Sequence, residues 1–104
     1  MKKVIMVVDD DKEVMEVFVD AIQTLYDNYE VIGFICPKEA LKNLSRADII
    51  LTDYMMPGIT GDVIKSEAIK QGKRAYIITG FPDIEIADLY KPFSFDADLA
   101  PLLN

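Results

Sequence analysis

The chain has 104 residues, 51% of them hydrophobic, and its 18 acidic and 11 basic residues give a net charge of −7. This length suits one domain with its own core, while the negative charge argues against sequence-independent binding of DNA or RNA. There is no histidine and one cysteine, Cys36, which excludes a zinc site of Cys and His ligands and an internal disulfide. No apolar stretch reaches the length of a membrane span, so we expect one cytoplasmic domain over residues 1–104 that contacts neither membrane nor nucleic acid.

Short apolar runs bounded by turn residues predict five strands. Runs of this kind are typical of strands that are buried on both faces of a parallel sheet. The predicted strands cover residues 4–8, 30–35, 49–52, 75–79 and 87–90.

Helical segments alternate with these strands, and each has a residue suited to its start or its end. They are residues 12–26 after the cap Asp11, 37–44 from Pro37, 62–71 before Gly72, and a short piece after Ser94 that Pro101 interrupts. This alternation predicts an α/β fold, with a parallel sheet covered by helices on both faces. We expect Cys36 to be buried or half-buried without a redox role, and the helices to bury Val14, Phe18, Ala21, Ile22, Leu25, Ala40, Leu41, Leu44, Val63, Ile64 and Ala68.

The connection between the last two predicted strands is too short for a full helix. Only residues 80–86 separate them, and seven extended residues reach at most about 25 Å. A crossover that contains a helix needs about 10 to 12 residues or more. We therefore expect the sheet to lack cover over its fourth and fifth strands. A partner protein could bind there, or a second copy of the chain could bind there and form a homodimer.

Charged and polar side chains follow four of the predicted strands. Asp9 and Asp10 come after the first, Asp53 after the third, Thr79 ends the fourth, and Lys91 follows the fifth. The carboxyl ends of parallel strands meet at one edge of the sheet, which is where open α/β sheets bind ligands. We therefore expect these side chains to form one site.

Three neighbouring carboxylates remain ionised more readily when a cation lies among them. Oxygen ligands suit Mg²⁺, which accepts one or two carboxylates and retains several waters. We expect Asp10 and Asp53 to bind the ion directly, Asp9 to bind it through water, and the backbone carbonyl of Met55 to add a further oxygen. The side chains of Met55 and Met56 are expected only to pack.

A carboxylate beside Mg²⁺ can attack phosphorus and form an aspartyl phosphate. The protein then needs mainly to align the groups and to neutralise charge on the phosphoryl oxygens. Lys91 could bind one of these oxygens, and the hydroxyl of Thr79 with the N–H of Gly80 could bind another. We expect Asp53 to be the nucleophile.

Four motifs that occur in this order resemble the receiver domain of two-component response regulators, the CheY-like family. They are Val7-Val8-Asp9-Asp10-Asp11, Asp53-x-x-Met56-Pro57-x-x-x-Gly61, Ile78-Thr79-Gly80 and Lys91-Pro92-Phe93. The resemblance covers essentially the whole chain, and it implies a flavodoxin-like five-stranded parallel sheet of order 2-1-3-4-5. It also implies a cis peptide bond between Lys91 and Pro92.

The resemblance implies that Asp53 accepts a phosphoryl group from a sensor histidine kinase or a histidine phosphotransfer protein. Asp9 and Asp10 would be the acidic Mg²⁺ pair, Thr79 the switch hydroxyl and Lys91 the phosphate-binding cation. Such a domain is not an enzyme toward other substrates, since it catalyses only its own phosphorylation and autodephosphorylation. It signals by conformational change or acts as a stand-alone relay or phosphate sink.

Two features depart from the family pattern, and two other classes of function stay open. The fourth helix is missing, and Asp88 stands where the family has a switch aromatic, with Tyr90 the nearest aromatic residue. One alternative is a small Mg²⁺-dependent phosphatase that forms an aspartyl phosphate, although the acids after the first strand, Asp9, Asp10 and Asp11, are contiguous where that class has Asp-x-Asp. The other alternative is an inert interaction module.

Overall fold

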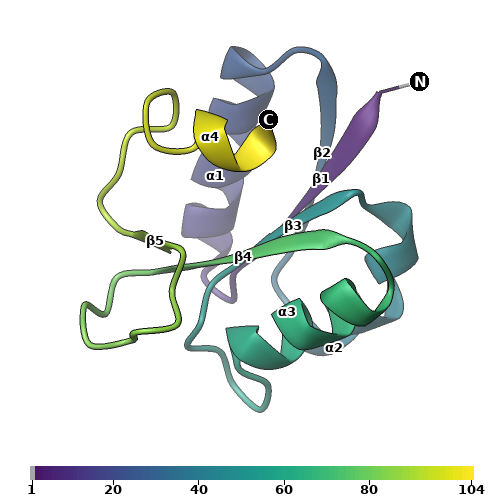
Figure 1. Ribbon diagram of the computed structural model, residues 1–104, viewed down its shortest axis with the longest axis vertical. Coiled ribbons are helices and arrows are strands. Elements are labelled where there is room, and N and C mark those ends of the chain that lie inside the picture. Colours follow the sequence, from purple (N-terminus) through teal and green to yellow (C-terminus); the bar gives the residue numbers. More distant parts are fainter. Residues whose placement is uncertain (1) are drawn as a thin grey trace.

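The computed structural model describes residues 2–104. Strands and helices alternate along most of the chain (Figure 1). In order they are β1 (Lys3–Val8), α1 (Lys12–Leu25), β2 (Tyr29–Phe34), α2 (Pro37–Lys42), the 3-10 helix η1 (Leu44–Arg46), β3 (Ile49–Thr52), α3 (Gly61–Lys70), β4 (Arg74–Thr79), β5 (Leu89–Tyr90) and α4 (Ala100–Leu103).

The five strands form one parallel sheet of order β2-β1-β3-β4-β5, which confirms the predicted topology. The central strands β1 and β3 are the most buried, and every residue of β3 is inaccessible to solvent. This burial explains why β3 is a continuous apolar run without alternation.

Helices cover both faces of the sheet and produce two hydrophobic clusters. Figure 1 shows α1 and α4 on one side of the sheet and α2 and α3 on the other. Because successive strand residues point to opposite faces, Ile5 and Val7 join the cluster under α1 and α4, while Met6 and Val8 join the cluster under α2 and α3.

Two residues that were predicted to lie in the core, Leu25 and Val63, are exposed, so the prediction is wrong for them. Leu25 is 48% exposed because it ends α1, and Tyr26 and Tyr29 pack against the cluster instead. Val63 is 46% exposed, since it precedes the buried Ile64 by one position and so lies about 100° away around the helix.

Cys36 is exposed rather than buried. It occupies the N-cap position of α2, in the turn that leaves β2, and the following Pro37 is the residue that turns inward.

The connection from β4 to β5 contains no helix, as predicted, and β5 is shorter than predicted. Residues 80–88 contain no helix and no strand. The strand begins at Leu89 because the Asp88 side chain takes the place of a backbone acceptor: Ile77 N–H donates to Asp88 Oδ2 at 2.7 Å, while Asp88 N–H donates to Ile77 O at 2.8 Å.

The C-terminal helix also differs from the prediction. Ser94 caps only a turn, in which its Oγ accepts a hydrogen bond from Ala97 N–H. Pro101 lies in the first turn of α4 instead of interrupting it, where its missing N–H costs nothing. The Arg74 guanidinium donates hydrogen bonds to the carbonyl oxygens of Leu102 and Asn104 and so anchors this helix beside β4.

The Lys91–Pro92 peptide bond is cis, as the resemblance implied. Among residues 2–104, none of the helices has both the length and the apolar character that crossing a membrane requires.

Candidate metal centre

The carboxyl edge of the sheet brings three carboxylates together. Asp9, Asp10 and Asp53 each offer an oxygen that lies within 4.8 Å of those of the other two. Asp9 is 5% exposed, Asp53 is half-buried and Asp10 is open to solvent. The predicted neighbours thus meet at one place, with access from solvent on the side of Asp10.

Backbone hydrogen bonds orient the two inner carboxylates. Asp53 follows β3 directly, and its N–H donates to Val8 O at 2.9 Å, which extends the β1–β3 ladder by one residue. Its Oδ1 accepts from Tyr54 N–H at 3.0 Å. Asp9 Oδ1 accepts from Asp11 N–H at 3.0 Å. Both side chains are therefore held by the turns that leave their strands.

The loop after Asp53 folds back onto the backbone of this residue. Gly61 N–H donates to Tyr54 O at 2.9 Å, and a Cβ atom at Gly61 would lie 2.2 Å from the Asp53 carbonyl oxygen. Only glycine permits this approach, which gives Gly61 of the sequence motif a structural role beside Asp53.

Lys91 supplies positive charge to the same site. Its Nζ lies 3.1 Å from Asp9 Oδ2 and 3.8 Å from Asp53 Oδ1. The backbone of Lys91 is fixed by its N–H, which donates to Thr79 O at 2.8 Å. The ammonium is therefore shared between the buried Asp9 and the half-buried Asp53.

An aromatic cluster beneath Lys91 was not recognised as part of the site from the sequence. The Nζ atom of Lys91 lies 5.5 Å from the centre of the Phe18 ring, which packs edge-on against Phe93 and Phe95. A cation over a ring face is attracted by it. Phe18 was predicted only as a core residue of α1, and the pair Phe93 and Phe95 just after Lys91 was the signal that could have revealed this contact.

Thr79 is fully buried at the end of β4. Its Oγ1 accepts a hydrogen bond from Phe81 N–H at 3.2 Å, and the hydroxyl hydrogen remains available for a further acceptor. Met55 has a half-exposed side chain, whereas Met56 is buried in the cluster under α2 and α3.

The electrostatics of the site favour a bound cation. Burial raises the pKa of Asp53, and the nearby charges of Asp9 and Asp10 raise it further, whereas Lys91 and the Tyr54 N–H lower it. One ammonium therefore does not compensate three acids. The donors are all oxygens, and this chemistry fits a hard divalent ion such as Mg²⁺.

The raised pKa of Asp53 predicts that ionisation of this side chain lowers the folding stability of the metal-free protein. Between the ordinary value of 3.8 and the raised value, the folded state binds more protons than the unfolded state, so stability falls as pH rises through this window. Asp53→Asn should therefore be more stable than wild type at neutral pH, and this advantage should disappear below pH 3.8. Urea unfolding of both proteins in the presence of a chelator, from below pH 3.8 to neutral pH, measures this difference in stability. Asp27→Asn, at an exposed turn, is the control, and an advantage that does not change with pH would contradict the account.

Comparison with known proteins identifies the family. The family model of the response regulator receiver domain matches residues 5–90 of this chain. Response regulator SaeR of Staphylococcus epidermidis is 43% identical over 65 residues, a match that spans 59% of this chain and 27% of that protein.

Two solved structures share the fold. Response regulator TrrA from Thermotoga maritima, crystallised with Mg²⁺ and BeF, is 34% identical with a TM-score of 0.72, and the match covers 90% of each chain. A chain from the crystal structure of histidine kinase ThkA in complex with TrrA is 27% identical with a TM-score of 0.75, over 98% of this chain and 99% of that one. The chain belongs to the response regulator receiver domain family of two-component signalling.

Proposed function

We propose that Asp53 accepts a phosphoryl group from a phosphohistidine of a sensor histidine kinase or a histidine phosphotransfer protein. The single observation that carries this proposal is the Lys91 ammonium, which lies 3.8 Å from Asp53 Oδ1 at the edge of the sheet where the three acids meet. Related TrrA has been crystallised with a histidine kinase, which supports a partner of this class.

The transfer is a single displacement at phosphorus. One carboxylate oxygen of Asp53 bonds to phosphorus as the bond from phosphorus to the donor imidazole nitrogen breaks, and the electron pair of that bond stays on the nitrogen. The protein contributes alignment and charge, because the phosphoryl oxygens carry most of the negative charge in such a transfer.

Three groups of the chain would bind these oxygens. Lys91 would shift its ammonium from the carboxylates toward one oxygen. The buried Thr79 hydroxyl would donate to another, since its oxygen already accepts from Phe81 N–H and its hydrogen is free to turn. The N–H of Gly80, next in sequence, would add a donor.

Asp9, Asp10 and Asp53 would hold Mg²⁺, with the Met55 carbonyl as a further oxygen ligand. The bound ion would supply positive charge against the phosphoryl oxygens. The acidic cluster supports this proposal by the closeness of its oxygens, and related TrrA was crystallised with Mg²⁺ and BeF.

The position of Asp11 weighs against the phosphatase alternative. Its Oδ1 accepts hydrogen bonds from Glu13 N–H at 3.0 Å and Val14 N–H at 3.3 Å, so this carboxylate caps α1. A capping carboxylate is engaged with the helix and is not available as a general acid at the site. We propose a phosphoacceptor that acts on no other substrate than its phosphoryl donor.

Acetyl phosphate tests this proposal. With Mg²⁺, the wild-type chain should gain the mass of one phosphoryl group, and Asp53→Asn should gain none, because the variant lacks the attacking carboxylate. Intact-mass spectrometry measures both. Asp27→Asn should be labelled like wild type, and equal labelling of Asp53→Asn would refute the assignment of the nucleophile.

Mg²⁺ should also stabilise the folded chain. A ligand of the native state at one hundred times its Kd contributes about 2.7 kcal/mol, which corresponds to a rise in Tm of about 10 °C for a domain of this size. Asp10→Asn should reduce this rise, since it replaces a negatively charged carboxylate ligand with a neutral amide, and Asp27→Asn should leave it unchanged. Thermal unfolding with and without Mg²⁺ gives the comparison. An undiminished shift in Asp10→Asn would exclude Asp10 as a ligand.

A further inference from the structure

A buried aromatic ring forms the inner wall of the site on the side of Lys91. Lys91 Nζ lies over the Phe18 ring, 5.5 Å from its centre. Phe18 is 8% exposed, whereas the side chain of Lys91 is 26% exposed. The ammonium therefore has the ring on its inner side and solvent on its outer side.

The space between this ring and the acids is too small to hydrate the ammonium. The cavity that Phe18, Lys91, Asp9 and Asp53 line has a volume of about 10 Å³, which is the minimum for a single water molecule. Apolar side chains of β1, β3 and β4 form much of the remaining lining. On its inner side, the ammonium thus has the electrons of the ring face where an exposed lysine has water.

Two further rings fix the plane of Phe18. Phe93 and Phe95 pack against it with ring centres 5.5 and 5.1 Å away and nearly at right angles, at 71° and 82°. The backbone of Lys91 is held separately by the hydrogen bond from its N–H to Thr79 O. The ring and the base of the lysine are therefore fixed, and the flexible stem of Lys91 is the part that can move.

The two acids attract Lys91 only while their charge is uncompensated. Nζ lies 3.1 Å from Asp9 Oδ2 and 3.8 Å from Asp53 Oδ1. When these carboxylates bind Mg²⁺, their attraction for the ammonium falls, because a bound cation compensates the charge of its ligands. The Phe18 ring carries no net charge, and its attraction for a cation is the same in both states.

We propose that Phe18 is a positioning residue for phosphoryl transfer, whose ring face keeps the Lys91 ammonium at the site after the acids have bound the metal. Lys91 then stays where it meets a phosphoryl oxygen instead of turning into solvent. This inference rests on the proposed role of Asp53 as phosphoacceptor. A residue that only packs would need no more than an apolar side chain of this size, so the test changes the electrons of the ring and keeps its shape.

Fluorine on the ring withdraws electron density from its face and nearly preserves its shape. The full chain is made with mono-, tri- or pentafluorophenylalanine in place of Phe18, and its phosphorylation by acetyl phosphate with Mg²⁺ is timed by intact mass. The rate should fall with each added fluorine, by about tenfold for the pentafluorinated ring, which is the rate equivalent of one cation–π contact at a partly desolvated site. In the Lys91→Gln background the same series should change nothing, because the ring acts through the ammonium.

Phe95 provides the matched control. It belongs to the same aromatic cluster, and within residues 2–104 neither a lysine nor an arginine lies over its ring. Pentafluorophenylalanine in place of Phe95 should therefore leave the rate at the wild-type value. Circular dichroism of every variant shows that the fold is retained.

A second measurement does not depend on the reaction. Protons above a ring face resonate upfield, so the methylene protons next to Nζ of Lys91 should lie upfield of those of Lys12, which is exposed on α1. This shift should persist when Mg²⁺ is added and should disappear in Phe18→Met, which keeps an apolar side chain without a ring. Loss of the shift on addition of Mg²⁺ would overturn the proposal.

The outcomes separate this role from the proposed function. A wild-type chain that takes up no phosphoryl group on Asp53 would overturn the proposed function and the role of Phe18 with it. A wild-type chain that is labelled, with an unchanged rate throughout the series at position 18, would overturn only the role of Phe18. Equal slowing by the fluorinated ring at position 95 would do the same, since it would show an effect of packing.

Discussion

The ammonium of Lys91, shared between Asp9 and Asp53, is the interaction on which the site depends. Buried carboxylates repel one another and are costly to ionise unless cations lie close to them. Lys91 relieves part of this cost at distances of 3.1 and 3.8 Å, and the raised pKa of Asp53 shows that relief is incomplete. The remaining cost is what makes a divalent ion a favourable ligand. The Phe18 ring below Lys91 links this balance to the packing of α1 against the C-terminal segment.

Much of this arrangement could be predicted because parallel strands impose it. Once the runs 4–8, 49–52 and 75–79 are recognised as parallel strands, the residues that follow them must meet at one edge. The small number of residues between the fourth and fifth strands was enough to predict that the β4–β5 connection lacks a helix. Side-chain contacts between distant segments could not be predicted in this way. The hydrogen bond from Ile77 N–H to Asp88, which delays β5 until Leu89, and the anchoring of α4 by Arg74 both depend on the finished fold.

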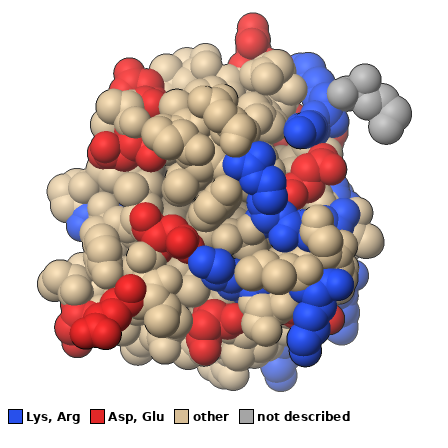
Figure 2. Space-filling model, viewed as in Figure 1, with Lys and Arg blue, Asp and Glu red and all other residues tan. Residues whose placement is uncertain are grey.

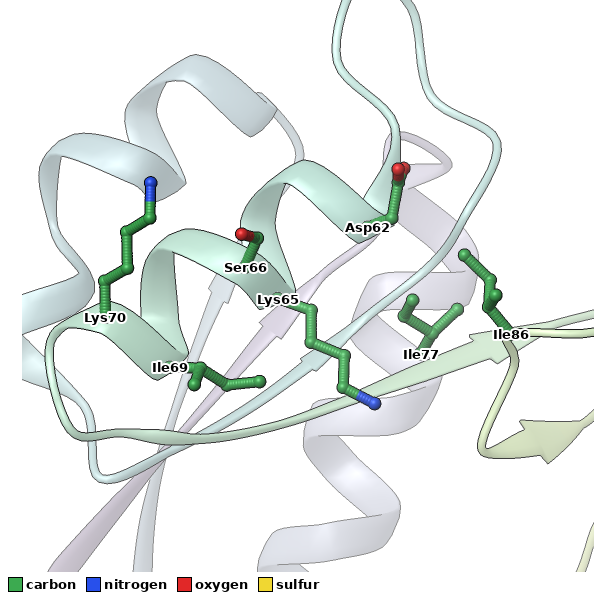
Figure 3. Close-up of a pocket in the computed structure, with 7 residues that line it drawn as sticks. All are labelled: Asp62, Lys65, Ser66, Ile69, Lys70, Ile77 and Ile86. Atoms are coloured by element: carbon green, nitrogen blue, oxygen red, sulfur yellow. The ribbon is translucent and has the colours of Figure 1, made fainter.

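Asp88 shows how a departure from the family pattern is accommodated. This carboxylate, at the position where the resemblance implies an aromatic residue, binds Lys65 of α3 and the backbone of β4. Figure 2 shows basic side chains gathered over α2 and α3 and acidic side chains gathered over the segment between β4 and β5, so this ion pair links regions of opposite charge. Lys65 reaches from α3 toward β4 across an open groove of about 400 Å³, which the missing helix leaves uncovered (Figure 3). The exposed Ile69 and Ile86 line this groove, so the same departures that remove the usual cover also create a defined surface.

The most direct test of the central claim is the rate at which Lys91→Gln is phosphorylated by acetyl phosphate with Mg²⁺, compared with Lys12→Gln at an exposed position of α1. If the ammonium stabilises the phosphoryl oxygens during transfer, Lys91→Gln should react about a hundredfold more slowly, in the range found when one such donor is removed. Lys12→Gln should react at the wild-type rate. A wild-type rate in Lys91→Gln would contradict the account.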